Sequence, residues 1–182
     1  SAATLLGYAL SKSPLAERLL SPFLVGSQSI PMAAIAPLLV IWFGPGLLSK
    51  VLICSLIVFF PVLVNTLVGL RDVSPELREV MRSLRATPAQ MLRYLEIPAA
   101  LPVFLGGLRV GASLSVIGAI VGELVASDRG LGFLINVGRG QYDTALVFVA
   151  VICLVALAAS LYGLVLLLEN RVLSWQTWRK EI

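Results

Sequence analysis

The stretch SPELREVMRSLRATPAQMLRYLEIPAALP, residues 74–102, gathers charged side chains between two long apolar segments, residues 51–70 and 99–126. Prolines at positions 75, 88, 98 and 102 divide it. Across the 182-residue chain, 58% of residues are hydrophobic and only 13% are charged, with a mean hydropathy of +0.95. A soluble domain of this size carries about 25% charged residues, and long apolar runs favour helices over a β-barrel. The composition therefore predicts an all-α integral membrane protein.

Apolar segments of helical length predict about four to five membrane spans within a single transmembrane domain, residues 1–182. A full span takes about 20 residues. The expected spans are the end of one helix at residues 2–10, a short one at 30–42, and full ones at 51–70, 99–126 and 145–168. The short span borrows length from residues 23–29 as a broken or kinked helix around its prolines. Because the chain starts partway through an apolar helix, we expect an N-terminal part of the domain to precede it.

Basic residues orient these spans, because Lys and Arg concentrate in cytoplasmic loops. If successive loops lie on alternate sides of the membrane, residues 11–29, 71–98 and 169–182 share one side and hold ten Lys and Arg. Residues 43–50 and 127–144 share the other side and hold three. The 71–98 loop and the C-terminus are therefore expected in the cytoplasm, and the 127–144 loop outside. The net charge of +4 records this topology, so no nucleic-acid partner is expected.

The 71–98 loop contains two predicted helix starts. Ser74 stands as a capping residue before Pro75 at the first helical position, with Glu76 in the first turn. Thr87 and Gln90 form the T-x-x-Q pattern of a capping box. Each start is followed by an apolar stripe at helical spacing: Leu77, Val80 or Met81, and Leu84 in the first helix, and Met91, Leu92 and Leu95 in the second.

Two interpretations of these amphipathic helices are open. They lie on the bilayer, anchored by arginines to anionic lipid, or they dock into a groove on another protein. Four carboxylates, those of Asp72, Glu76, Glu79 and Glu96, nearly balance the loop's five arginines and weaken attraction to lipid. The pattern therefore favours a protein partner.

The residues E-V-M-R-S-L-R-A-T, followed by I-P-A-A-L-P, resemble the EAA loop of ABC importer permeases. Glu79 matches the glutamate of that motif, Val80 and Met81 replace its two alanines, and Arg85 stands where the family commonly has glycine. The closing motif is matched by Ile97, Pro98, Leu101 and Pro102. The resemblance implies that the loop holds a coupling helix that inserts into a cleft on an ATPase subunit. Its coupling residues would be Glu76, Glu79, Val80, Met81, Arg82, Leu84, Arg85, Ala86 and Thr87.

The stretches IPMAAIAPLLVIWFGPGLLSK, FFPVLVNTLVGLRDV, LPVFLGGLRVGASLSVIGAIVGELV and DRGLGFLI are similar to the nitrate/sulfonate/taurine branch of these permeases. The resemblance implies a type I ABC importer transmembrane domain in the bacterial inner membrane. Implied partners are ABC ATPase subunits that hold ATP and Mg, a second permease subunit, and an external solute-binding protein meeting residues 43–50 and 127–144. Sulfonates, taurine, nitrate, riboflavin and a thiamin pyrimidine precursor all stay open as substrates.

Small and polar residues within the spans give candidates for the translocation pathway: Gln28, Asn65, Gly111, Ser115, Gly118 and Glu123. A stripe of small residues lies on one helical face and is formed by Gly107, Gly111, Ser115, Gly118 and Gly122. It packs closely at the pore or at the dimer interface, or it packs within the subunit. Asn65 lines a pathway or rescues carbonyls near Pro61. Glu123 is a gate or substrate contact, or it pairs with Arg129 or a backbone group. Arg109 is expected to extend towards the headgroups.

Two other classes of protein fit the sequence less well. An ion-coupled secondary transporter is the alternative function, but its one candidate carboxylate, Glu123, lies near a span end. An enzyme is not expected, because the chain has no histidine and no nucleophile–base pair. The cysteines Cys54 and Cys153 are expected as small core residues, and no metal site is expected. GPGLLSKV lacks the G-K-[ST] of a phosphate-binding loop, so no ATP or other cofactor is expected on this chain.

Overall fold

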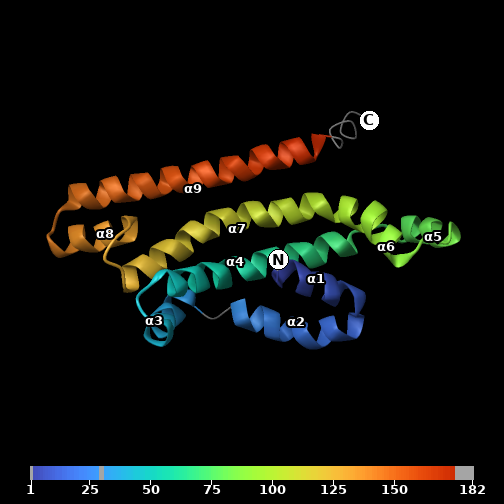
Figure 1. The fold of residues 1–182 in the computed structure, drawn as a ribbon, viewed down its shortest axis with the longest axis horizontal. Helices are drawn as coiled ribbons and strands as arrows, with labels where there is room; N and C mark the ends of the chain where they lie inside the picture. Colours follow the sequence, from blue (N-terminus) through green and yellow to red (C-terminus); the bar gives the residue numbers. More distant parts are fainter. Residues whose placement is uncertain (1, 29–30, 175–182) are drawn as a thin grey trace.

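In the computed structural model, which describes residues 2–28 and 31–174, the chain forms an elongated array of helices joined by short turns (Figure 1). The helices are α1 (Ala2–Lys12), α2 (Pro14–Gln28), α3 (Met32–Phe43), α4 (Leu47–Arg71), α5 (Pro75–Ser83), α6 (Pro88–Met91), the π-helical turn η1 (Leu92–Glu96), α7 (Ile97–Val125), α8 (Leu131–Gly140) and α9 (Thr144–Val172). The prediction of an all-α membrane fold is confirmed.

Three helices in the described part of the chain are long and apolar enough to cross a membrane: α4, the continuous helix Pro88–Val125, and α9. They correspond to the three full spans predicted from the sequence. Helix α2 ends at Gln28, and α3 begins at Met32 after the N-cap residue Pro31. The expected broken or kinked helix would pass through residues 29–30, which lie outside the described residues. A shorter apolar helix covers Ala34–Phe43.

Helices α4 and α7 pack against each other along the small-residue stripe predicted in residues 107–122. A Cβ on Gly118 would lie 2.9 Å from the Cα of Cys54, and one on Gly111 would lie 2.9 Å from Cγ1 of Val58. These glycines therefore let the two backbones approach closely. Of the two interpretations of the stripe, packing within the subunit is the one observed here.

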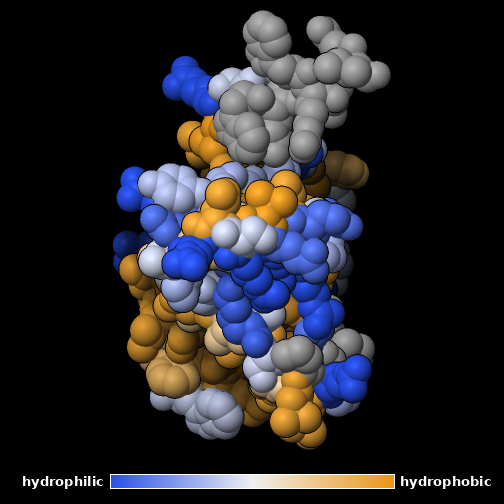
Figure 2. All heavy atoms as spheres, turned by 90° about the vertical axis from the view of Figure 1, so that its right-hand side faces the viewer, coloured by the Kyte–Doolittle hydropathy of each residue, from blue (hydrophilic) through white to orange (hydrophobic). Residues whose placement is uncertain are grey.

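The charged segments predicted to share one side of the membrane gather at one end of the molecule. The α1–α2 turn, α5, α6 and the end of α9 lie at the right of Figure 1, whereas α3 and α8 lie at the left. Figure 2, which views that right-hand end, shows hydrophilic side chains across its middle with apolar side chains among them. We call this the α5 end of the molecule.

The two predicted helix starts in the charged loop differ from each other. Thr87 forms the expected capping box: its Oγ1 accepts from the N–H of Gln90 at 3.3 Å, and its own N–H donates to Gln90 Oε1 at 2.8 Å. Ser74 precedes α5 as expected but makes no side-chain cap, because its hydroxyl donates to the Glu76 carboxylate instead.

The prolines of the charged loop predict two short helices, with Pro98 and Pro102 marking the re-entry into the next span. The second helix does not stop at Pro98, so this expectation of a separate short helix is wrong. It continues from α6 through η1 into α7. A π turn, closed by the bond from Ile97 N–H to the Leu92 carbonyl, adds a residue just before Pro98, where the ring and the missing N–H would disturb α-helical bonding. The proline is thus accommodated in the first turn of α7.

Candidate functional site

Helix α5 exposes the apolar stripe predicted for it. Leu77 is 49% exposed, Val80 54% and Leu84 73%, and α5 has no buried residue. We call these three residues the α5 ridge. Met81, the other residue considered for the stripe, is half-buried. Large apolar side chains at the polar end of a membrane protein mark a surface that another molecule covers.

Polar coupling residues lie beside the ridge and are open to a partner. Glu76, Glu79, Arg82 and Thr87 are exposed, and Ala86 is half-buried. The hydrogen bond from the Ser74 hydroxyl lowers the pKa of Glu76, which keeps this carboxyl ionised at neutral pH. The ridge is therefore flanked by charges of both signs, as a protein-docking surface requires.

The end of α5 explains the glycine that is common in the resembling motif. Arg85 has a φ of 54°. The N–H of Ala86 donates to the Met81 carbonyl at 3.0 Å, and the N–H of Arg85 donates to the Arg82 carbonyl at 2.9 Å. This is a Schellman arrangement, whose left-handed residue is usually glycine because a Cβ is strained there. The turn therefore forms in this chain in spite of the arginine.

Short connections and side-chain bonds join α5 to the spans. Only residues 72–74 separate it from α4, and residues 84–87 separate it from α6. Arg78 Nη2 donates to the Leu70 carbonyl at 2.7 Å, which ties α5 to the end of α4. Helix α5 is therefore joined closely to α4 and, through α6 and η1, to α7.

Sequence reasoning missed three ion pairs between the helices. Lys12 Nζ lies 2.6 Å from Glu96 Oε1, and the Glu96 side chain is only 4% exposed. Arg71 pairs with Glu17. Arg109, expected to extend towards the headgroups, instead pairs with Glu169 of α9 and lies 5.6 Å from the centre of the Tyr162 ring. The partners are 84, 54 and 60 residues apart, so no local pattern could have identified them.

The predicted pathway residues of α4 and α7 meet at the interface of these helices. Asn65 donates to the Pro61 carbonyl at 2.8 Å and packs beside Gly107. Ser115 donates to the Ala112 carbonyl at 2.7 Å. The bond from Asn65 fits the interpretation in which this side chain hydrogen-bonds a backbone carbonyl near Pro61. Gly111 and Gly118 are buried against α4, so they face the interior of this chain.

Glu123 lies apart from the other pathway candidates, at the junction of α7 and α8. Its Oε2 accepts from the N–H of Gly132 at 2.7 Å, in the first turn of α8. A carboxylate at a helix N-terminus is stabilised by the free N–H groups and the helix dipole. Of the two partners predicted for Glu123, the backbone group is the one observed, because Arg129 pairs with Asp128 instead. Gln28 ends α2, and its side chain is outside the described part of the structure.

The two cysteines lie in different surroundings. Cys54 is half-buried at the α4–α7 interface, but Cys153 is exposed on α9, so the expectation of a core position for Cys153 is wrong. The reason is that the described residues leave most of α9 uncovered, so an apolar side chain on this helix has few neighbours there. Among the described residues no group of three His, Cys, Asp or Glu side chains could hold a metal ion.

Comparison with known families identifies the chain. Residues 2–174 match the family described as "binding-protein-dependent transport system inner membrane component". The chain belongs to this family. The resemblance to ABC importer permeases drawn from the charged loop is thereby confirmed, and the three long apolar helices agree with a family of inner-membrane components.

Three relatives illustrate the range of the family. The riboflavin transport system permease protein of Chloroflexus aurantiacus is 49% identical over 160 residues, which cover 88% of this chain and 60% of that protein. The formylaminopyrimidine transport permease protein of Halalkalibacterium halodurans is 39% identical, covering 88% and 64%. The taurine transport system permease protein of Escherichia coli is 36% identical, covering 93% and 62%. The chain thus spans less than two thirds of the length of these relatives.

Proposed function

We propose that the protein is the membrane-spanning permease subunit of an ATP-binding-cassette importer and forms part of the path of a small solute. The observation that carries this proposal is α5: a helix at the polar end of a family member, with an exposed apolar ridge and short links to two spans. The ridge would fill a groove on an ATPase subunit, which binds and hydrolyses ATP with Mg. Our proposal places α5 and the C-terminus in the cytoplasm.

The coupling step follows from the connections of α5. When the ATPase subunits close, the docked α5 moves with them. The three-residue link to α4 and the Arg78–Leu70 bond carry the displacement into one span, and the α6–η1 helix carries it into α7. Because the α4–α7 contact is a close backbone fit, both spans move together as a rigid pair. This would alternate the access of a path formed with a second permease subunit.

The end of the molecule opposite α5 is where the solute would arrive. A solute-binding protein would meet residues 43–50 and 127–144 at the end opposite α5. Glu123 lies at that end, and we propose that it contacts the arriving solute. The other candidates for the solute path are Gln28, Asn65, Gly111, Ser115 and Gly118. Riboflavin is the first solute to test, because a 49% identical relative is named for its transport.

The ion-coupled alternative has less support. It depended on Glu123 as an intramembrane carboxylate, and that carboxylate is bound to the backbone of α8 near the end of α7. Relatives named as permease proteins of transport systems favour the importer.

Co-purification of the full-length chain with its ATPase tests the proposal. We expect wild type to retain a nucleotide-binding subunit, and Glu79→Arg and Leu77→Ser/Leu84→Ser to lose most of it while remaining folded in detergent. Tyr142→Ser is the matched control, because Tyr142 is 92% exposed at the opposite end. If folded wild type brings no ATPase, or if both ridge and control variants retain it equally, the docking role of α5 is wrong.

A further inference from the structure

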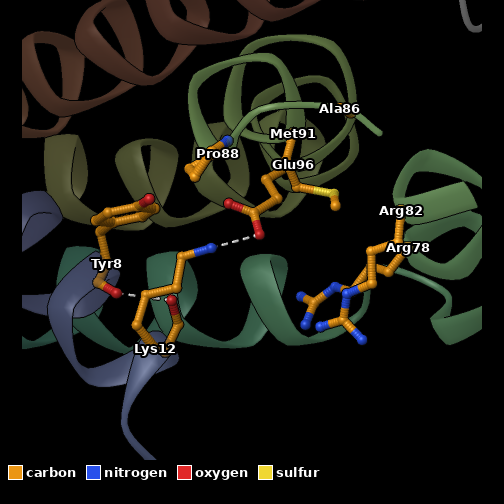
Figure 3. A pocket seen from close by; sticks show the side chains of 9 residues that line it. Tyr8, Lys12, Arg78, Arg82, Ala86, Pro88, Met91 and Glu96 are labelled. Carbon is orange, nitrogen blue, oxygen red and sulfur yellow. Dashed lines mark hydrogen bonds and ion pairs between the residues drawn. The ribbon is translucent and has the colours of Figure 1, made fainter. Parts of the chain in front are cut away.

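A pocket at the α5 end carries more positive charge than its own residues neutralise. It has a volume of about 650 Å³ and lies between α1, α5 and the α6–η1 helix (Figure 3). Lys12, Arg78 and Arg82 contribute three cations, and Glu96 contributes the one carboxylate among its lining residues. Since Lys12 already pairs with Glu96, neither arginine has an anionic partner among the residues that the structure describes.

The two arginines are arranged to bind an anion together. They stand four residues apart on α5, and Figure 3 shows their side chains extending from that helix in the same direction. Like charges at this spacing repel. Arg78 Nε is buried without a hydrogen-bond partner, and the Arg82 side chain makes no hydrogen bond or ion pair within the described residues. A tetrahedral oxyanion would satisfy both forks, as arginine pairs do for phosphate.

An apolar groove adjoins this pocket and is lined by residues of α1, α4, η1 and α7. It has a volume of about 410 Å³ and shares Tyr8 with the pocket. Leu5 lines it one turn before Tyr8 on α1, and Ile97 and Leu101 line it after Glu96 on α7. Moving from Glu96 to Leu101 leads from the polar end into the span. In the topology proposed above, the charge would lie at the headgroup level and the groove would enter the hydrocarbon.

We propose that this pocket and groove bind one anionic phospholipid, with its phosphate on Arg78 and Arg82 and an acyl chain along Leu5, Ile97 and Leu101. An anionic phospholipid is proposed because the basic pocket and the apolar groove lie next to each other. A basic site alone would suit any phosphate, and an apolar groove alone would suit any lipid. Basic pockets beside membrane helices bind anionic headgroups for this reason. The bound lipid would link α1, α5 and α7 at the point where α5 joins the spans.

Lipid retention by the purified full-length permease tests the assignment. Native mass spectrometry would follow phosphatidylglycerol and phosphatidylcholine of identical chains through detergent exchange. We expect phosphatidylglycerol to be retained roughly 10- to 30-fold better, since each basic residue near an anionic headgroup contributes about fivefold. Arg78→Gln/Arg82→Gln should remove this preference. Arg93→Gln should keep it, because Arg93 is an exposed arginine of η1 that does not line the pocket.

Three results would overturn the proposal. Equal retention of the two lipids would show that the arginines do not select the headgroup. Displacement of phosphatidylglycerol by millimolar glycerol 3-phosphate would show a phosphate site that does not use the groove. Loss of phosphatidylglycerol when the ATPase subunit is bound would assign the pocket to an acidic side chain of that subunit. If the double variant fails to fold, Arg82→Glu alone replaces it, because Arg82 is exposed and makes no side-chain bond.

Discussion

Arg85 holds the left-handed position that ends α5, and its Cβ makes that position costly. Replacement by glycine should stabilise the turn by about 1 kcal/mol, because the φ of 54° is strained for any residue with a Cβ and free of strain for glycine. The measurement is amide hydrogen exchange of α5 in the full-length protein, where Arg85→Gly should slow exchange about fivefold.

The matched control for Arg85 is Arg93→Gly, since Arg93 lies within the continuous helix Pro88–Val125. There the same substitution should destabilise its own segment by about 1 kcal/mol, because glycine has low helix propensity. Faster exchange of α5 in Arg85→Gly would show that the arginine makes a contact worth more than the strain.

At the scale of elements, the close fit between α4 and α7 depends on single missing side chains. Gly118→Val should destabilise the protein by about 2–3 kcal/mol, because its Cβ would meet the Cα of Cys54 at 2.9 Å, and backbone cannot move aside as a flexible side chain can. Thermal denaturation of the detergent-solubilised protein measures the loss.

Gly106→Val provides the control on the same helix. A Cβ on Gly106 meets nothing within 4 Å, so this variant should change stability by less than about 1 kcal/mol. Equal losses in the two variants would mean that helix propensity, and not the α4–α7 contact, accounts for the effect. The stripe on α7 could be predicted from the sequence, but the helix that it faces could not.

At the scale of the whole molecule, the Lys12–Glu96 pair joins the first helix to the base of α7. Lys12→Met should cost about 2–3 kcal/mol, because it leaves the buried Glu96 carboxylate without its cation. The double variant Lys12→Met/Glu96→Leu should recover most of this loss, since it removes the buried charge as well.

A double-mutant cycle on thermal stability measures the interaction energy between Lys12 and Glu96 separately from the effect of each single substitution. Independent, additive losses at the two positions would show that the pair does not hold α1 against η1. The observed pair also shows why a basic residue in residues 11–29 and a carboxylate in the charged loop belong to one end of the molecule.

Much of the fold could be predicted because its signals are local. The class followed from composition, the three full spans from runs of apolar residues, and the start of α6 from Thr87 and Gln90, which lie only three residues apart. The continuous path through Pro98 was missed, because a proline predicts a boundary locally and only a π turn, supported by the long helix around it, removes that boundary.

The sequence by itself determined that this is a helical membrane protein with an amphipathic charged loop, and the resemblance in that loop pointed to the correct family. Local periodicity and capping patterns are sufficient for this, because they depend on residues within one or two turns. Only the tertiary structure decided that the glycine stripe faces α4, that Glu123 binds the start of α8, and that Lys12 meets Glu96. These contacts join residues on different helices, and their geometry is set by how the helices pack rather than by any spacing along the chain.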